Sequence, residues 1–402
     1  MSETRNLLEL WKAAEAGDDD IILGTVVRVE GSSYRKPGAR MLLTKSGERS
    51  GMISGGCLEA EVSRKAWWLT ESGPSVQSYG AFFDDDNPSP HGLGCGGTVH
   101  LLLERGNSAA MALTTIRESV VSRIHSAMLT VIASEHPAMP RASRIIARQA
   151  GEISSSLISL DPGSEGWRLL NAIAARALED RRSEYVSLKI DEHEVEVFAE
   201  YVAPPQALII FGAGDDTVPV VEFASGLGWH VTVADSRSHL ATTARFPQAD
   251  KVVALKSDAA SALSLFPLQM KPDDAVIIMT HSYMQDRSLM RELLPQPLAY
   301  LGLLGPRLRS SRLIAEIAAE IGLNLDACIG KVHSPVGLDI GGDNPSAIAL
   351  SIVAGVQAAV HHRSSRHADW DDAQIWHQPS SIARDVQNVF ADDVSPTYKI
   401  GA

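Results

Sequence analysis

Two cysteines of this 402-residue chain stand in glycine-rich turns, Cys57 in GMISGGCLEAEV and Cys95 in DDDNPSPHGLGCGG. Their glycine neighbours are Gly55, Gly56, Gly94 and Gly96. Glycine lets a bulky group approach the backbone closely, and the N–H groups at a helix start stabilise an anion such as a thiolate. A thiolate at Cys57 would therefore be stabilised, and Cys95 lies between glycines in a second loop that we expect to fold around a ligand.

A short basic loop, SSYRKPGAR, precedes these turns. It holds Arg35, Lys36 and Arg40, which could meet an anionic ligand, and a solvated turn is the alternative interpretation. The third cysteine, Cys328, lacks glycine on both sides, and we expect it to be a small buried side chain of the core.

Strand-like segments separated by turn residues, and helical patterns, predict the elements that must position these turns. Strands are expected over 21–30, 39–45 and 49–54, a helix over 57–70, and strands over 75–83 and 98–104 that bracket the Cys95 loop. A similar mixture of helices and strands continues to residue 202, and no repeat of fixed period is evident. The sequence therefore predicts an N-terminal mixed α/β domain over residues 1–202.

A dinucleotide-binding pattern begins after the stiff Ala-Pro-Pro segment at 203–205. An apolar strand leads into Gly212 and Gly214, a helix and a second apolar strand follow, and that strand ends at Asp235. This acid lies close to the spacing at which it reaches a ribose hydroxyl. The pattern then alternates to residue 362, which predicts a C-terminal Rossmann-like domain over 206–362 with a mostly parallel sheet.

Two features weaken the case for a tightly bound dinucleotide. Thr217 stands where the third glycine of the fingerprint belongs, and Asp215 and Asp216 lie where a phosphate would approach. Polar clusters follow the later strands, among them THSYMQD with His281, and a helix capped by Asn344 is expected over 345–360.

Composition excludes several classes of protein. The formal net charge is −13, which opposes general nucleic-acid binding, because phosphates attract clustered lysine and arginine. The apolar runs are too short for a membrane span, and the start MSETRN lacks the features of a signal peptide. Three cysteines are too few for a disulfide framework, so we expect a cytoplasmic protein with reduced thiols. Residues 363–402 are expected to form a polar tail.

Taken together, the motifs resemble the XdhC/CoxI family of molybdenum-hydroxylase maturation factors over roughly residues 10–360. The resemblance rests on GSSYRKPGARM, SGGCLEAEV, GLGCGGTVHLLLE, FGAGDD, MTHSYMQD, GLLGPR and PVGLDIGG. It implies a chaperone without turnover of its own that binds molybdenum cofactor, protects it while its terminal sulfur is installed, and aids its insertion into a xanthine dehydrogenase-type hydroxylase. It also implies a homodimer, the hydroxylase as client and a cysteine desulfurase as a further partner.

The resemblance gives the candidate residues their roles. Molybdopterin, alone or in a dinucleotide form, carries a phosphate and a dithiolene, which suit the charges of Arg35 and Arg40 and the sulfurs of Cys57 and Cys95. Gly212, Gly214, Asp235 and His281 are the candidate cofactor-binding residues of the second domain.

Two other activities stay open. One is an NAD(P)-dependent oxidoreductase that uses the Rossmann-like domain, with His281 as acid or base. The other is a sulfur relay in which Cys57 or Cys95 carries a persulfide. Oxidation of xanthine by this chain alone is not expected, since three cysteines cannot complete the four ligands of an iron–sulfur cluster.

Overall fold

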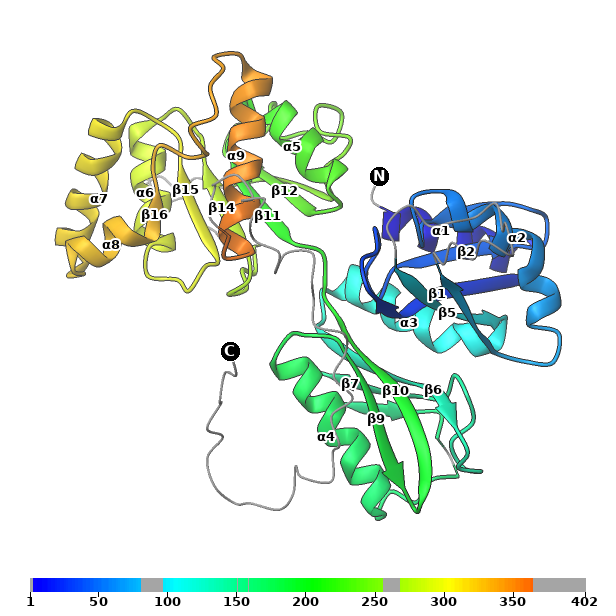
Figure 1. The fold of residues 1–402 in the computed structure, drawn as a ribbon. Coiled ribbons are helices and arrows are strands. Elements are labelled where there is room, and N and C mark those ends of the chain that lie inside the picture. The colour runs from blue at the N-terminus through cyan, green and yellow to red at the C-terminus, as the bar shows by residue number, and fades with distance from the viewer. Residues whose placement is uncertain (1–2, 81–96, 150, 158, 256–267, 364–402) are drawn as a thin grey trace. The chain divides into compact units, whose positions relative to one another are not determined.

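A computed structural model describes residues 3–80, 97–149, 151–157, 159–255 and 268–363 (Figure 1). The described chain divides into two compact units, one that ends at Pro204 and one that begins at Pro205. Three predictions lie outside the described residues: the placement of Cys95, that of its neighbours Gly94 and Gly96, and the polar tail from residue 364 onward.

The first unit opens with a helix and a five-stranded antiparallel sheet. The sheet has the order β3-β2-β1-β5-β4, and α2 packs on one face of it through Leu58, Val62 and Ala66. The elements are α1 (Glu3–Ala16), β1 (Ile21–Glu30), β2 (Arg40–Thr44), β3 (Arg49–Gly51), α2 (Cys57–Leu69), β4 (Ser75–Gly80) and β5 (Thr98–Arg105). These elements follow the predicted ones closely, because apolar runs bounded by turn residues mark β1, β2 and β5 in the sequence.

The second half of this unit repeats the same arrangement. Its sheet has the order β8-β7-β6-β10-β9, and α4 lies along one face of it (Figure 1). The elements are α3 (Asn107–Ser122), β6 (Ser126–Ser134), β7 (Arg144–Arg148), β8 (Ile153–Ser155), α4 (Glu165–Glu179), β9 (Glu184–Ile190) and β10 (His193–Val202). Both halves have the order αβββαββ with the same strand neighbours, so the unit is a tandem duplication of one fold.

Backbone details support the duplication. In the first copy the N–H of Gly38 donates to the carbonyl of Val26 at 2.8 Å, and in the second the N–H of Ala142 donates to the carbonyl of Val131 at 2.8 Å. Both donors have a positive φ, 95° and 67°. A β-bulge follows Val26 in β1 and Val131 in β6.

The duplication is compatible with the prediction that the sequence holds no repeat of fixed period. The spacing of the copies is not fixed, because 17 positions (81–97) separate β4 from β5 whereas a two-residue turn joins β9 to β10. A backbone fold can be kept while side chains and loop lengths change, so sequence periodicity alone did not reveal the repeat.

The second unit is a six-stranded sheet in which every strand pair is parallel, with the order β13-β12-β11-β14-β15-β16. Its elements are β11 (Ala207–Phe211), α5 (Thr217–Gly226), β12 (His230–Asp235), β13 (Lys251–Ala254), β14 (Ala275–Ile278), α6 (Tyr283–Leu293), β15 (Tyr300–Leu303), α7 (Arg307–Ile321), α8 (Leu325–Lys331), β16 (Val332–His333) and α9 (Pro345–Val360). This confirms the predicted fold class, a mixed α/β region followed by a Rossmann-like domain.

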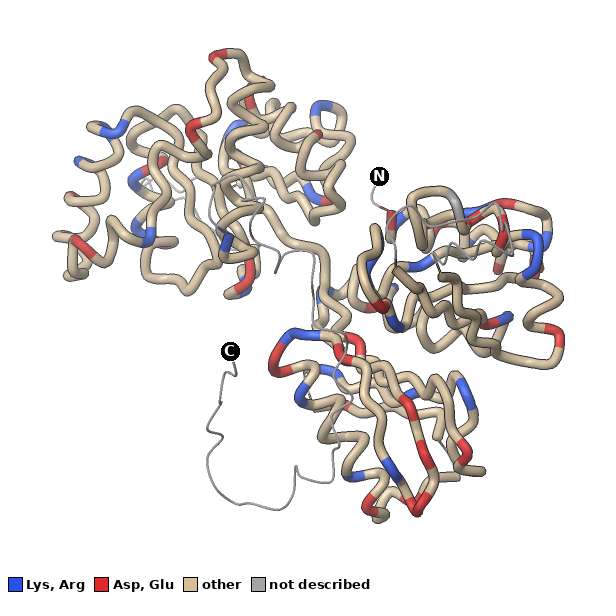
Figure 2. The backbone as a smooth tube through the Cα atoms, in the orientation of Figure 1, with Lys and Arg blue, Asp and Glu red and all other residues tan. Residues whose placement is uncertain are grey.

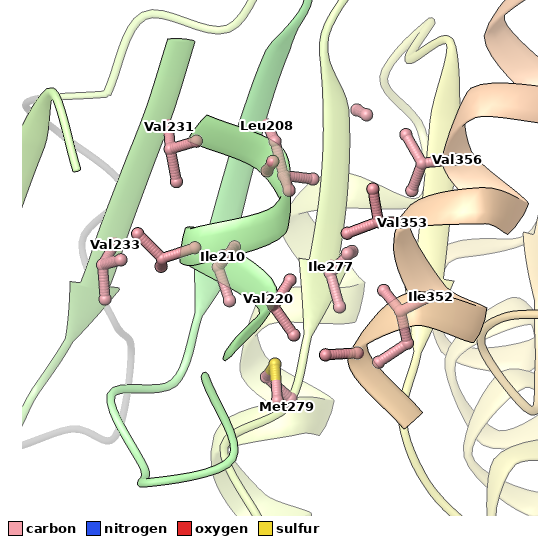
Figure 3. Close-up of a cluster of buried hydrophobic side chains, with 14 of the residues drawn as sticks. Leu208, Ile210, Val220, Val231, Val233, Ile277, Met279, Ile352, Val353 and Val356 are labelled. Atoms are coloured by element: carbon pink, nitrogen blue, oxygen red, sulfur yellow. The ribbon is translucent and has the colours of Figure 1, made fainter. Parts of the chain in front are cut away.

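Helices cover both faces of the parallel sheet. Val220 of α5 and Ile352 of α9 pack on one face beside Ile210 of β11 (Figure 3). On the other face, Cys328 of α8 is 3% exposed within the core that α6 and α7 complete, which confirms its predicted burial. The predicted cap is also confirmed, since Asn344 Oδ1 accepts the N–H of Ala347 at 2.9 Å.

Candidate functional site

A loop, a turn and the two glycines that flank residues 81–96 meet at one edge of the first sheet. Because its strands are antiparallel, the loop 31–39, the turn 52–56, Gly80 at the end of β4 and Gly97 before β5 all lie where β1, β3 and β4 end and β2 and β5 begin. We call these residues, together with Cys57, the site edge. The segment that holds Cys95 therefore starts and finishes at the edge where Cys57 begins α2.

Gly97 fits tightly at this edge. A Cβ on Gly97 would lie 2.1 Å from the carbonyl oxygen of Ser32 and 2.7 Å from that of Glu30. Such distances are far below van der Waals contact, so only glycine lets this segment pass the basic loop. The end of the Cys95 segment is consequently placed against residues 30–32.

The Gly-Gly turn before Cys57 is open. Gly56 has a φ of 114°, in the region that favours glycine, and α2 begins directly after it at Cys57. No atom lies within 4 Å of a Cβ added to Gly55 or Gly56, and both residues are exposed. The structure thus confirms that Cys57 heads a helix, and it leaves the backbone of the two glycines open to solvent. The side chain of Cys57 lies outside the described structure.

A buried carboxylate, which the sequence did not single out, holds this turn. Glu59 is 2% exposed and accepts hydrogen bonds from the N–H groups of Ile53 at 3.0 Å and Ser54 at 2.7 Å and from the Ser54 hydroxyl at 2.6 Å. The Ser54 hydroxyl oxygen in turn accepts from the N–H of Leu58 at 3.1 Å. The available signal was a serine just before a helix with a glutamate in its first turn.

The charge of Glu59 has an electrostatic consequence. Burial acts to raise the pKa of Glu59, but the hydrogen bonds from Ser54 and Ile53 outweigh it and keep the pKa below its ordinary value. A negative charge therefore lies beneath the Gly-Gly turn. An anionic ligand at this turn needs cations from other segments of the site edge.

The basic loop supplies cations, and two of its three are already paired. Arg35 donates to both carboxylate oxygens of Glu3 at 2.8 Å, and Glu3 also accepts the N–H of Met52 at 2.8 Å. Glu3 thereby joins the loop 31–39 to the turn 52–56. Arg40 forms a largely buried ion pair with Glu200, whereas Lys36 is exposed.

The glycine pattern of the second unit forms a tight turn after β11. Gly212 has a φ of 128°, and a Cβ there would lie 2.3 Å from the carbonyl oxygen of Met279. Only glycine therefore lets the end of β11 approach the end of β14 so closely. This is the strand end at which parallel sheets bind ligands.

Asp235 is fully engaged at the same edge. Its Oδ1 accepts from the backbone N–H of Arg237 at 2.8 Å and from Arg237 Nε at 3.0 Å, and its Oδ2 accepts from the N–H of Ala213 at 2.7 Å and from Arg237 Nη2 at 2.7 Å. A carboxylate offers about four lone-pair sites. The four donors fill them, so no acceptor position is left for a ribose diol.

Acidic residues surround the start of α5. Asp216 pairs with His281 Nε2 at 2.9 Å, and Asp215 pairs with Arg245 at 2.5 Å. His281 has a φ of 59°, which is uncommon for a residue with a side chain and recurs at functional sites. The pairing with Asp216 brings His281 to the glycine turn. The carboxylates of Asp215 and Asp216 would repel a phosphate there.

The polar side chains that follow β14 and β15 form one hydrogen-bonded network. Asp286, 1% exposed, accepts hydrogen bonds from Thr280 and from Arg309. This network fixes the start of α6 against that of α7. Among the described residues, no group of three or more His, Cys, Asp or Glu side chains is arranged to hold a metal ion.

Two further observations bear on nucleic-acid binding and on membrane spans, which the composition argues against. Acidic and basic positions are interspersed along both units (Figure 2). Within the described part of the chain, no helix has the length and apolar character that crossing a membrane requires.

Comparisons with known proteins bear on both units. Residues 14–80 match the model of the XdhC and CoxI family, and residues 208–356 match that of the XdhC Rossmann domain. A Bacillus subtilis protein, named as a probable subunit of xanthine dehydrogenase, is 31% identical over 343 residues, 84% of this chain and 92% of that protein. An uncharacterised Escherichia coli protein is 32% identical over 149 residues, 37% of this chain and 26% of that protein.

A solved structure is also similar. It is a crystal structure described as a xanthine dehydrogenase from Bacillus halodurans, with 28% identity and a TM-score of 0.68. The likeness covers 92% of this chain and 99% of that chain. The similarity therefore extends over both units.

Proposed function

Because this chain belongs to the XdhC and CoxI family, we propose that it is a maturation factor that binds molybdenum cofactor and assists its sulfuration and insertion into a hydroxylase. The family relationship supports an accessory role toward xanthine dehydrogenase. The finer role rests on the site edge. The observation that carries it is the meeting of the Cys57 turn, the basic loop and both ends of the Cys95 segment.

The residues of the site edge fit such a cofactor. The exposed turn at Gly55 and Gly56 leaves space for a bulky group to reach the backbone. The exposed Lys36, beside the Arg35–Glu3 pair, provides positive charge for a phosphate, and this charge is needed because Glu59 is negative beneath the turn. The thiolates of Cys57 and Cys95 would act as soft ligands toward molybdenum. When bound, the cofactor supplies the molybdenum that receives the terminal sulfur.

Partners follow from this role. The client is a molybdenum hydroxylase of the xanthine dehydrogenase type, a cysteine desulfurase is the source of the sulfur, and the factor acts as a homodimer in the cytoplasm. Binding and release suffice for delivery, so the chain needs no turnover of its own. The cofactor is molybdopterin, with or without an attached nucleotide.

The oxidoreductase alternative has less support. The four donors on Asp235 occupy the oxygens that would bind a ribose, and Asp215 and Asp216 lie where a pyrophosphate would approach the start of α5. His281 would be the acid or base of that reaction. Its position at the glycine turn is the one observation that favours it.

The test is to express the chain in cells that make molybdenum cofactor and to measure molybdenum and pterin per purified chain. We expect Cys57→Ala and Cys95→Ala each to lose most of the bound pterin. Cys328→Ala is the matched control, because it removes a thiol that is buried in the second unit, and it should retain pterin. Equal occupancy in all four proteins would remove both thiols from the proposed site.

A further inference from the structure

Three successive backbone N–H groups at the site edge each donate to a carboxylate. Those of Ile53 and Ser54 donate to Glu59, and that of Met52 donates to Glu3 at 2.8 Å. Successive N–H groups of a turn are a common anion-binding arrangement. The turn 52–54 therefore binds anions, and both anions that it holds belong to the chain itself.

The two carboxylates differ in how firmly they are held. Glu59 is 2% exposed and lies only five and six residues from its donors in the turn. The side chain of Glu3 is 39% exposed and reaches the turn from α1, 49 residues earlier in the sequence. An exposed ion pair adds little stability, because water competes for both partners. Glu59 is therefore a permanent part of the turn, whereas Glu3 can be replaced.

Glu3 also occupies the guanidinium of Arg35. Nη2 of Arg35 donates to both oxygens of this carboxylate at 2.8 Å. One anion is thus held by a guanidinium and a backbone N–H together, and proteins use both of these donors to bind phosphate groups. Arg35 and the N–H of Met52 form an anion subsite, and the carboxylate of Glu3 marks its place.

The body of α1 does not depend on this ion pair. Leu7 and Trp11 of the same helix are buried in a core cluster that α1 shares with α3. Rotation of the Glu3 side chain about its own bonds is therefore enough to uncover both donors. Such rotations are fast in exposed side chains, so the subsite can exchange its occupant without movement of the helix.

Charge decides which class of ligand can displace Glu3. A free carboxylate offers the same two oxygens and the same single charge, and it lacks the advantage of being attached to the chain. A phosphate monoester offers three terminal oxygens and nearly two negative charges. Arg35 and the exposed Lys36 next to it supply two positive charges. The subsite therefore favours a phosphate monoester over a carboxylate.

We propose that Glu3 is a built-in competitor for this subsite, and that the phosphate of a ligand displaces its carboxylate from Arg35 and from the N–H of Met52. The natural ligand rests on the proposed function, in which the phosphate is that of the pterin cofactor. The inference goes further by assigning the phosphate to these two donors and by giving the first residue of α1 control over them.

The experiment is titration of the full chain with inorganic phosphate at constant ionic strength, followed by the width of the phosphorus NMR signal. We expect Glu3→Ala to bind phosphate roughly three- to tenfold more tightly than the wild type, because a site that is mostly filled by its own side chain loses apparent affinity in proportion. The double variant Glu3→Ala/Arg35→Gln should lose this gain. Glu9→Ala removes an exposed acid from the same helix and should bind phosphate as the wild type does.

Equal affinity of Glu3→Ala and Glu9→Ala for phosphate, or a gain that persists in the double variant, would overturn the proposal. Pterin per purified wild-type chain separates this result from the proposed function. Pterin in the wild type with no gain in Glu3→Ala rejects the built-in competitor alone. A gain in Glu3→Ala with no pterin in the wild type rejects the cofactor role and supports the phosphate subsite.

Discussion

Arg40 and Arg144 occupy the same position in the two copies of the duplicated fold, and each forms an ion pair with a glutamate of the other copy. Arg40, the first residue of β2, pairs with Glu200 of β10, and Arg144, the first residue of β7, pairs with Glu104 of β5. The strand registers make Glu104 and Glu200 equivalent.

The two ion pairs join the copies reciprocally. Each arginine also donates to the carbonyl two residues before it, at 2.9 Å to Gly38 and 3.0 Å to Ala142. The contacts between the copies are therefore approximately twofold symmetric, because each copy makes the same ion pair with the other. The shared geometry makes Arg40 part of the interior of this unit.

The buried pair Arg144–Glu104 gives the first prediction. Both side chains are at most 3% exposed, so Arg144→Leu leaves an uncompensated carboxylate inside the unit. We expect a loss of about 3–5 kcal/mol in the free energy of unfolding. The double variant Arg144→Leu/Glu104→Leu should lose less than Arg144→Leu alone, because no charge is left buried. Denaturant titration measures both, and a loss under about 1 kcal/mol in the single variant would contradict the prediction.

The buried carboxylate of Glu59 predicts that the stability of the folded state depends on pH. Its pKa is lowered from an ordinary value of 4.5 by hydrogen bonds that outweigh burial. The folded state therefore favours the carboxylate, and this stabilisation is present above the unfolded pKa and is lost as the pH falls through the folded pKa. Glu59→Gln should flatten the acid limb of a plot of melting temperature against pH. Glu61→Gln makes the same substitution on the same helix and leaves the hydrogen bonds from Ile53 and Ser54 to Glu59 in place, so it is the matched comparison.

The saturated carboxylate of Asp235 predicts the response to NADH. We expect the dissociation constant of NADH to exceed about 1 mM, since no oxygen of Asp235 remains for the ribose. Asp235→Asn should leave this weak affinity unchanged and destabilise the unit by about 1–3 kcal/mol, because Arg237 and Ala213 lose a charged acceptor. Fluorescence titration checks the affinity. Micromolar binding that disappears in Asp235→Asn would instead favour the oxidoreductase alternative.

His333 predicts an effect near neutral pH. Its ring stacks on Tyr300 with centroids 4.2 Å apart, and this partial loss of contact with water lowers its pKa from 6.5, although the residue as a whole stays exposed. The neutral form is favoured in the folded state, so stability should rise with pH from the folded pKa up to about 6.5. His333→Phe keeps the stacking and should weaken this dependence. An unchanged slope in thermal melts between pH 5 and pH 7 would assign the dependence to another group.

The sequence predicted the elements better than the relations between them. Apolar runs located β1, β5 and β11, and Asn344 with Pro345 located the start of α9, because these signals are local. The pairing of Arg40 with Glu200 was not predictable, since it joins residues from two copies of a fold that share little sequence. The four donors on Asp235 were missed for a related reason. Three of them come from Arg237, and the dinucleotide-binding pattern in the sequence does not report the side-chain conformation of neighbouring residues.

Gly97 tests whether the site edge must keep its shape. Gly97→Ala would place a Cβ 2.1 Å from the carbonyl oxygen of Ser32, so the backbone on one side of this contact must shift. We expect a loss of about 1–3 kcal/mol in stability and at least a severalfold drop in pterin per chain, because the Cys95 segment ends at this residue. Gly226→Ala is the control, since a Cβ there has no atom within 4 Å and φ is not positive. Wild-type pterin content in Gly97→Ala would mean that the close passage between Gly97 and the basic loop does not shape the cofactor site.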